Sequence, residues 1–196
     1  MRGDITDLPR RLTLKEWLDL RPEPPQCVID NLLPVGGLSI LAAHPKAGKS
    51  TLVRNLILSV SRGQSFLGRQ CTQGTVLYLA MEEPESHVIN EFRKMGARCE
   101  PIVARLGPIP KAQIHKVIAQ DILEVRPILA VIDPLFDALE LDDANNYARV
   151  NAAMKAILNI ARHTNVHICT VHHTNKSDNR GGLSILGSQA LAGSTD

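Results

Sequence analysis

The stretch that most constrains the fold of this chain is GGLSILAAHPKAGKSTLVRNLIL, residues 36–58. Its apolar run at 37–43 predicts a strand, and the amphipathic segment at 49–62 predicts a helix that ends at Gly63. A strand that leads through a glycine-bearing loop into a helix N-terminus is typical of phosphate-binding sites. The residues expected to bind phosphate are His44, Pro45, Lys46, Ala47, Gly48, Lys49, Ser50 and Thr51.

Each residue type in this loop has a chemical reason. In the phosphate-loop pattern G-x-x-x-x-G-K-[ST], backbone N–H groups cradle the phosphates, the lysine reaches the β- and γ-phosphates, and the hydroxyl coordinates Mg²⁺. Gly48, Lys49 and Ser50 match the last three positions, whereas Ala43 replaces the first glycine. The alternative, that Gly-Lys-Ser is merely a turn, is disfavoured by the strand before it and the helix after it. We therefore expect a nucleotide site.

The rest of the chain alternates between the two kinds of element. Strands are predicted at residues 75–80, 101–106, 128–133 and 166–171, and helices at 84–95, 112–125 and 147–163. This alternation predicts an α/β fold of three layers, a mostly parallel sheet with helices on both faces. Ligands of such sheets bind at the carboxyl ends of the strands, so the residues that end each strand are the candidates for chemistry.

Carboxylates end two of the predicted strands. Asp133 follows ILAVI and is expected, with Ser50, to hold Mg²⁺; its alternative role is that of a helix cap. Glu82 and Glu83 follow VLYLAM and offer a base for the attacking water, although acidic residues there also favour a helix N-terminus. We favour Glu82 as the base, with Glu83 as its helper, because Glu82 is nearer to the strand.

Histidines end the last predicted strand. His172 and His173 are placed where a donor could sense a γ-phosphate. One alternative is that an imidazole of this pair is simply buried and hydrogen-bonded. A zinc site is the other alternative, but alternation along a strand places the candidate ligands on different faces. Those candidates are His163, His167, Cys169, His172 and His173.

The polar segment at 177–187 contains glycine and predicts a loop. It is a candidate contact with a DNA or RNA backbone, which basic side chains and exposed N–H groups bind. No aromatic residue lies among the basic ones, and a solvated loop is the competing interpretation. The candidate nucleic-acid residues are Lys176, Arg180, Gly181 and Gly182.

Composition limits the classes of protein to which the chain could belong. A formal charge of +2 is too small to indicate nucleic acid by itself. The four cysteines contain no C-x-x-C pair, so we expect reduced thiols. The N-terminus has no signal-peptide core, and no segment reaches the length of a membrane span. We therefore expect a cytoplasmic protein with no membrane contact. Residues 1–27 are expected to form an arm, with a short helix capped by Thr13 and a proline-rich connector, ahead of a core at 28–196.

Taken in order, GGLSILAAHPKAGKS, VLYLAMEEP, ILAVIDP, VHICTVHHTNK and GSQALAGSTD resemble the RecA-like ATPases of the hexameric replicative helicase branch, most closely the RepA-type helicases and their AAA-type relatives. The resemblance implies ATP hydrolysis with Mg²⁺, Glu82 as the base, and His173 with His172 as the γ-phosphate sensor. It also implies single-stranded DNA as the partner, contacted after Lys176, and a homo-oligomeric ring, hexameric when complete.

The same resemblance implies an arginine finger late in the domain, which we do not assign, and final strands that we expect beyond Asp196. The competing functions are a recombinase, a KaiC-like signalling ATPase, and a nucleotide-binding interaction module that does not hydrolyse ATP.

Overall fold

The computed structural model describes residues 11–20, 24–44, 46–135 and 147–173. For residues 147–149 and 173 it describes the backbone alone. The helices are α1 (Leu14–Asp19), α2 (Lys49–Arg62), α3 (Glu85–Lys94), α4 (Ile114–Val125) and α5 (Tyr147–Thr164), with a 3₁₀ turn η2 (Lys111–Gln113) before α4. The strands are β1 (Cys27–Ile29), β2 (Leu33–Pro34), β3 (Leu38–Ala43), β4 (Val76–Ala80), β5 (Ile102–Leu106), β6 (Leu129–Asp133) and β7 (His167–His173).

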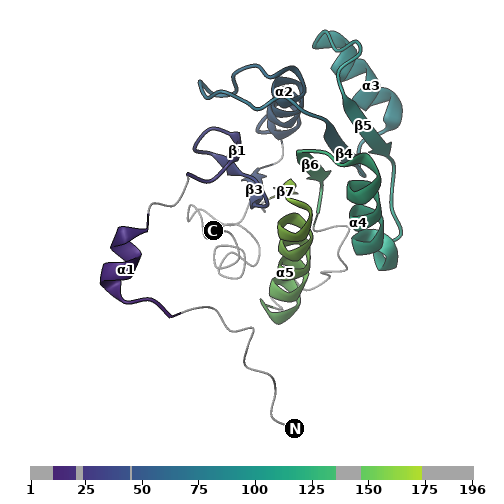
Figure 1. The fold of residues 1–196 in the computed structure, drawn as a ribbon. Coiled ribbons are helices and arrows are strands. Elements are labelled where there is room, and N and C mark those ends of the chain that lie inside the picture. The colour runs from purple at the N-terminus through teal and green to yellow at the C-terminus, as the bar shows by residue number, and fades with distance from the viewer. Residues whose placement is uncertain (1–10, 21–23, 45, 136–146, 174–196) are drawn as a thin grey trace.

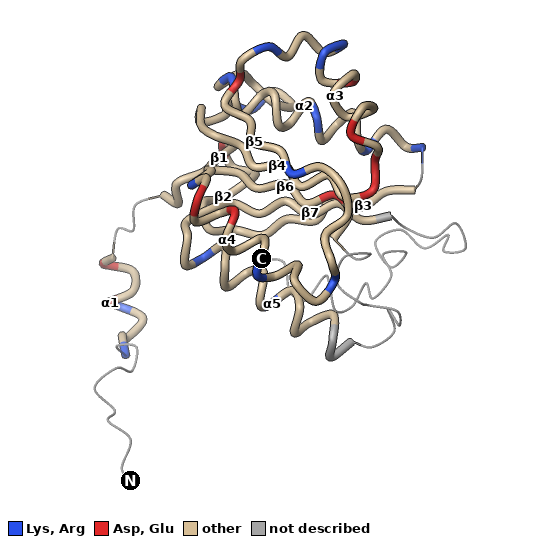
Figure 2. Tube along the Cα trace, turned by 90° about the vertical axis from the view of Figure 1, so that its right-hand side faces the viewer, with Lys and Arg blue, Asp and Glu red and all other residues tan. Residues whose placement is uncertain are grey.

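A parallel five-stranded sheet, in the order β3-β7-β6-β4-β5, forms the centre of the domain. All five residues of β4 and of β6 are buried, as continuous apolar strands covered on both faces should be. Helices α2 and α3 cover one face and α4 and α5 cover the other (Figure 1; Figure 2). The predicted three-layer α/β fold is therefore confirmed.

The core has two halves, one on each face of the sheet. On one face Leu77, Leu79, Ala130 and Ile132 pack against α4 and α5. On the other face the alternate residues of β4 and β6 pack against α2, α3 and the β1–β2 hairpin. Side chains of one strand alternate between the faces, so this division also fixes which residues near the strand ends share a face.

The hairpin of β1 and β2 is a feature that the sequence analysis did not predict. Its strands have three and two residues, and Asn31 in the turn has a left-handed φ of 52°. Ile29 also bridges to Cys71, which joins the hairpin to the segment between α2 and β4. Val28, Ile29 and Leu33 are buried in the α2 half of the core, so the hairpin extends that half.

Helix α1 differs from the other helices because none of its residues is buried. Thr13 and Glu16 form a capping box, in which Thr13 N donates to Glu16 Oε2 at 2.6 Å and Glu16 N donates to Thr13 Oγ1 at 3.3 Å. Both views place α1 away from the layered domain (Figure 1; Figure 2). The capping that the sequence predicted is confirmed.

Candidate nucleotide-binding site

The loop between β3 and α2 has the geometry of a phosphate loop. Ala47 N donates to His44 O at 3.2 Å, and two loop residues are left-handed, Lys46 at φ 66° and Gly48 at φ 85°. A Cβ built on Gly48 would meet no atom within 4 Å, so the requirement for glycine comes from its φ and not from crowding by the protein. Pro45 lies outside the described residues.

The alanine at the first pattern position fits the strand. Ala43 is the last residue of β3, pairs in register with His173, and is not left-handed. An L-residue is therefore accommodated without backbone strain where the pattern has glycine.

Helix α2 begins directly after the loop. Its N-cap is Gly48, which makes no side-chain hydrogen bond, and Lys49, Ser50 and Thr51 form the first turn. The first N–H groups of a helix have no partner within the helix, and they carry the positive end of its dipole. The first turn of α2 is therefore suited to bind an anion.

Lys49 connects this loop to the rest of the site. It is only 6% exposed, and its Nζ donates to Ala43 O at 2.7 Å and to His44 O at 3.0 Å. Burial lowers the pKa of Lys49, and the charges of Asp133 and Glu82 oppose that shift. Both carboxylates therefore lie close enough to Lys49 to act on its charge.

The register of the sheet explains why the two carboxylates meet. Ala80, the last residue of β4, pairs with Asp133, the last residue of β6, and Met81 N donates to Asp133 O at 2.9 Å. Asp133 is buried at 8% exposure, whereas Glu82, two residues beyond Ala80, is exposed. Strands β4 and β6 thus end side by side. Their ends bring the buried carboxylate of Asp133 and the exposed carboxylate of Glu82 toward Lys49.

Glu83 has a different environment from Glu82. It forms an ion pair with Arg54, a residue of α2 that is only 3% exposed, and His87 Nε2 lies 3.5 Å from the same carboxylate oxygen. The fully buried Tyr78 lies near this pair, since the charges of Arg54 and Glu83 both act on its hydroxyl. Burial first, and then the Asp133 carboxylate, raise the pKa of that hydroxyl. Glu83 is thereby joined to buried groups beneath the site.

The sequence analysis did not identify Arg54 or Tyr78. A signal for Arg54 was present, because it lies three residues before Ile57 and four before Leu58, at helical spacing with residues that are buried. A guanidinium within an apolar stripe needs a buried partner, and the adjacent pair of glutamates supplies one. Tyr78 gave no signal beyond its place in an apolar strand.

The two histidines at the end of β7 are only partly described. His172 is buried and shares a face of β7 with Ile168, which belongs to the α4 and α5 half of the core. Asp133 shares its face of β6 with Val131, in the α2 half. His173 pairs with Ala43 in the backbone ladder, and its side chain lies outside the described part. Alternation along the strands thus places His172 and Asp133 on opposite faces of the sheet.

Several other expectations concern residues that the structure does not describe. Lys176, Arg180, Gly181 and Gly182 lie outside the described residues. No group of three His, Cys, Asp or Glu side chains in the described part could hold a metal ion. Of the zinc candidates, His167 instead bonds Pro34 O and Ser39 Oγ. None of the helices described is long and apolar enough to span a bilayer.

A parallel α/β sheet with a phosphate loop at one strand end defines a P-loop nucleotide-binding domain. Residues 6–179 match the family model described as AAA domain, and the chain therefore belongs to that family. Membership makes this an ATPase-type nucleotide-binding domain. No curated protein shows a significant match to the chain.

Proposed function

We propose that this domain is the ATP-hydrolysing motor of a RepA-type replicative DNA helicase, which acts on single-stranded DNA as part of a hexameric ring. The observation that carries the ATPase part is the electrostatic coupling of Lys49 to both Asp133 and Glu82. These residues come from α2, β6 and the segment after β4, and an ATPase needs a phosphate-binding cation, a metal-binding carboxylate and a base in one place.

The residues present fit a magnesium nucleotide. The open space at Gly48 leaves room for a phosphate beside the backbone, and the first turn of α2 presents N–H groups to it. Ser50 and Asp133 supply the hard oxygen ligands that Mg²⁺ prefers. Bound there, Mg²⁺ would neutralise charge between the β- and γ-phosphates.

In the proposed mechanism each residue of the chain has one role. Lys49 exchanges its bonds to the Ala43 and His44 carbonyls for bonds to phosphate oxygens. Glu82 orients the attacking water and accepts its proton, as its exposed position permits. Glu83 forms an ion pair with Arg54, and this pair holds in place the segment that carries Glu82. Of the histidines, we propose His173 for sensing the γ-phosphate, because alternation places the buried His172 on the face of the sheet opposite Asp133.

The helicase part of the proposal is supported by the order of the sequence motifs. The AAA family match supports the ATPase part. DNA contact through Lys176, Arg180, Gly181 and Gly182 and assembly into a hexamer are parts of the same proposal. A recombinase and a KaiC-like signalling ATPase use the same kind of site, so activity on DNA distinguishes these functions.

The test compares Glu82→Gln with Glu85→Gln, an exposed glutamate of α3 that serves as the matched control. Glu82→Gln should reduce kcat for ATP hydrolysis by about 10²–10⁴-fold, because it removes the base, and leave ATP affinity unchanged. Glu85→Gln should leave both unchanged. A wild-type chain that binds ATP without turnover would identify a nucleotide-binding interaction module, and turnover that single-stranded DNA does not stimulate would exclude the helicase.

A further inference from the structure

Tyr78 carries a polar atom into the middle of an apolar strand. Its side chain is fully buried, and among the described residues it is the largest side chain of which this is true. Its hydroxyl forms no hydrogen bond of ordinary geometry with any described residue. A buried hydroxyl without such a bond is unfavourable, and folded proteins pair nearly all groups of this kind. The hydroxyl is therefore a candidate for a role that the folded chain alone does not fulfil.

The sheet places this hydroxyl beside the proposed metal ligand. In the register of β4 and β6, Tyr78 pairs with Val131 and Ala80 pairs with Asp133. Residues two apart on a strand share a face, so Tyr78 and Asp133 lie on the same face, one step apart along neighbouring strands. The Asp133 carboxylate lies within range of a weak hydrogen bond from the hydroxyl, and its charge acts on the hydroxyl as well. Tyr78 is thus in position to hold Asp133 from its buried side.

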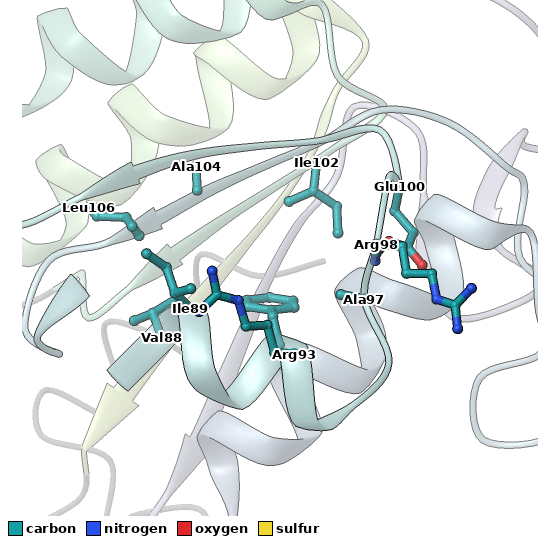
Figure 3. A pocket seen from close by; sticks show the side chains of 10 residues that line it. Val88, Ile89, Arg93, Ala97, Arg98, Glu100, Ile102, Ala104 and Leu106 are labelled. Atoms are coloured by element: carbon teal, nitrogen blue, oxygen red, sulfur yellow. Dashed lines mark hydrogen bonds between the residues drawn. The ribbon is translucent and has the colours of Figure 1, made fainter. Parts of the chain in front are cut away.

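The ring of Tyr78 is fixed by helix α3. Phe92 of α3 meets the ring edge to face, with ring centroids 6.0 Å apart and planes at 66°. The helix itself packs on β5, and Figure 3 shows Val88 and Ile89 of α3 on the side of Leu106 of the strand. Because α3 is held against the sheet, the ring has little freedom to turn, and the hydroxyl keeps its direction.

Arg54 is a charged neighbour of the hydroxyl, but its charge is engaged by Glu83. The two side chains form an ion pair, and the charges of both act on the hydroxyl. A cation bonded to Asp133 would compete with Mg²⁺ for the carboxylate, because both are attracted to the same negative charge. A hydroxyl orients a carboxylate without neutralising it. Tyr78 therefore offers Asp133 a neutral donor, while Glu83 engages the cation of Arg54.

We propose that Tyr78 is a positioning residue for Asp133, whose carboxylate its hydroxyl holds in the orientation that ligates Mg²⁺. A carboxylate has two oxygens that accept, so Asp133 can take a hydrogen bond from Tyr78 and ligate a metal at the same time. This inference rests on the proposed function, in which Asp133 is a ligand of Mg²⁺. It adds a residue that touches neither nucleotide nor metal and acts through the carboxylate.

Calorimetric titration of the full chain with ADP tests this role without requiring hydrolysis. The quantity compared is the Mg²⁺ concentration that gives half of the full gain in ADP affinity. Tyr78→Phe removes the hydroxyl and keeps the ring, so ADP affinity with Mg²⁺ chelated should equal that of the wild type. The half-maximal Mg²⁺ concentration should rise about 10–100-fold, the usual cost of losing a hydrogen bond to a metal ligand. The Tm without nucleotide should not fall, because the hydroxyl has no ordinary hydrogen bond to lose.

Thr170→Val is the matched control, because it also removes one buried hydroxyl from the sheet. Thr170 is fully buried, and its Oγ1 donates to Ser39 O at 3.2 Å. It shares a face of β7 with Ile168, in the α4 and α5 half of the core, which is the face opposite Tyr78. This variant should lower the Tm, since it breaks an ordinary hydrogen bond, and leave the half-maximal Mg²⁺ concentration unchanged.

A double-mutant cycle shows whether Tyr78 acts through Asp133. Asp133→Asn should lose most of the gain in ADP affinity that Mg²⁺ gives. Adding Tyr78→Phe to that chain should have no further effect, because the two side chains act as one unit. A residue that only supports the fold would weaken binding in both backgrounds.

The inference alone is overturned if Mg²⁺ tightens ADP binding to the wild type and Tyr78→Phe needs no more Mg²⁺ than the wild type does. It is also overturned if Thr170→Val raises the half-maximal Mg²⁺ concentration as much, or if Tyr78→Phe weakens binding further in the Asp133→Asn chain. A wild-type chain whose ADP affinity does not depend on Mg²⁺ would instead overturn the proposed magnesium site, and this inference with it.

Discussion

At the scale of single residues, two adjacent glutamates have different surroundings. Glu83 pairs with Arg54, whose side chain is 4% exposed and whose Nε has no hydrogen-bond partner in the described part of the chain. A buried cation is costly without a counter-charge, so Arg54 depends on Glu83. Glu82 is exposed and acts electrostatically on Lys49. The pair therefore combines one structural carboxylate with one that can reach a water.

The first prediction concerns the different roles of Glu82 and Glu83. Glu83→Gln should lower the free energy of unfolding by about 2–4 kcal/mol, because it leaves a buried guanidinium without its anion, while kcat falls less than about tenfold. Arg54→Met should be destabilised less, because the carboxylate that it leaves, Glu83, has a side chain that is 24% exposed and can be hydrated. In the double variant the two losses should not add, since both remove the same ion pair. Urea denaturation and steady-state ATPase assays measure the two effects. A Glu83→Gln chain as stable as wild type but inactive would make Glu83 the base.

Residue identities at the site were predictable to the extent that they follow a pattern along the chain. The positions of Lys49, Ser50 and Asp133 follow from motifs that chemistry restricts. Arg54 and Tyr78 were missed because their place depends on two elements packing together, α2 against β4, which no local pattern encodes. The different surroundings of Glu82 and Glu83 depend on the same packing.

At the scale of elements, strands and helices were predictable and their order in space was not. The predicted strand at 128–133 is β6 (Leu129–Asp133), and the predicted helix at 49–62 is α2 (Lys49–Arg62). Buried parallel strands all read as continuous apolar runs, so the sequence did not show that β7 lies between β3 and β6. The β1–β2 hairpin was missed because strands of three and two residues are too short to show a period.

His167, at the start of β7, joins three of these elements. Its Nδ1 lies 2.7 Å from Pro34 O of β2, and its Nε2 lies 2.9 Å from Ser39 Oγ of β3. A carbonyl only accepts, so Nδ1 carries the proton and Nε2 accepts from the serine hydroxyl. Burial lowers the pKa of His167, with the bond to Pro34 opposing the shift. The fold therefore selects the neutral imidazole.

The second prediction follows from the sign of that shift. The ordinary histidine pKa is 6.5, so below it the unfolded chain binds a proton that the folded chain resists. Stability should be fully present above pH 6.5 and should fall as the pH drops below it. His167→Asn, which keeps a donor for Pro34 O but does not titrate, should flatten this dependence, as measured by urea unfolding at several pH values.

His115 tests whether the effect belongs to His167. Burial also lowers the pKa of His115, a half-buried residue of α4, so His115→Asn should remove a separate part of the slope. If the free energy of unfolding of His167→Asn depends on pH as strongly as that of the wild type, then neutral His167 does not stabilise the packing of β2, β3 and β7.

At the scale of the whole molecule, parallel strand ends bring together groups that are far apart in the chain. Lys49 lies 33 residues before Glu82 and 84 before Asp133, yet both carboxylates act on its charge. Each strand of a parallel sheet ends at the same edge, so every crossover helix returns the chain to one side. The phosphate loop, Asp133 and Glu82 can then be joined by a single ligand, and that ligand should stabilise the whole fold.

The last prediction measures that linkage. ATP with Mg²⁺ at about 100 times its Kd should stabilise the wild-type chain by about 2.7 kcal/mol, which raises Tm by about 5–10 °C for a domain of this size. Lys49→Met should lose most of this rise, because it removes the cation for the phosphates and keeps the aliphatic stem. Its Tm without nucleotide should change little, since relief from burying the ammonium offsets the loss of its attraction to Asp133 and Glu82. Lys116→Met, an exposed lysine of α4 on the other face of the sheet, should keep the full rise, and chelating Mg²⁺ should reduce it. A full rise in Lys49→Met would place the nucleotide away from this loop.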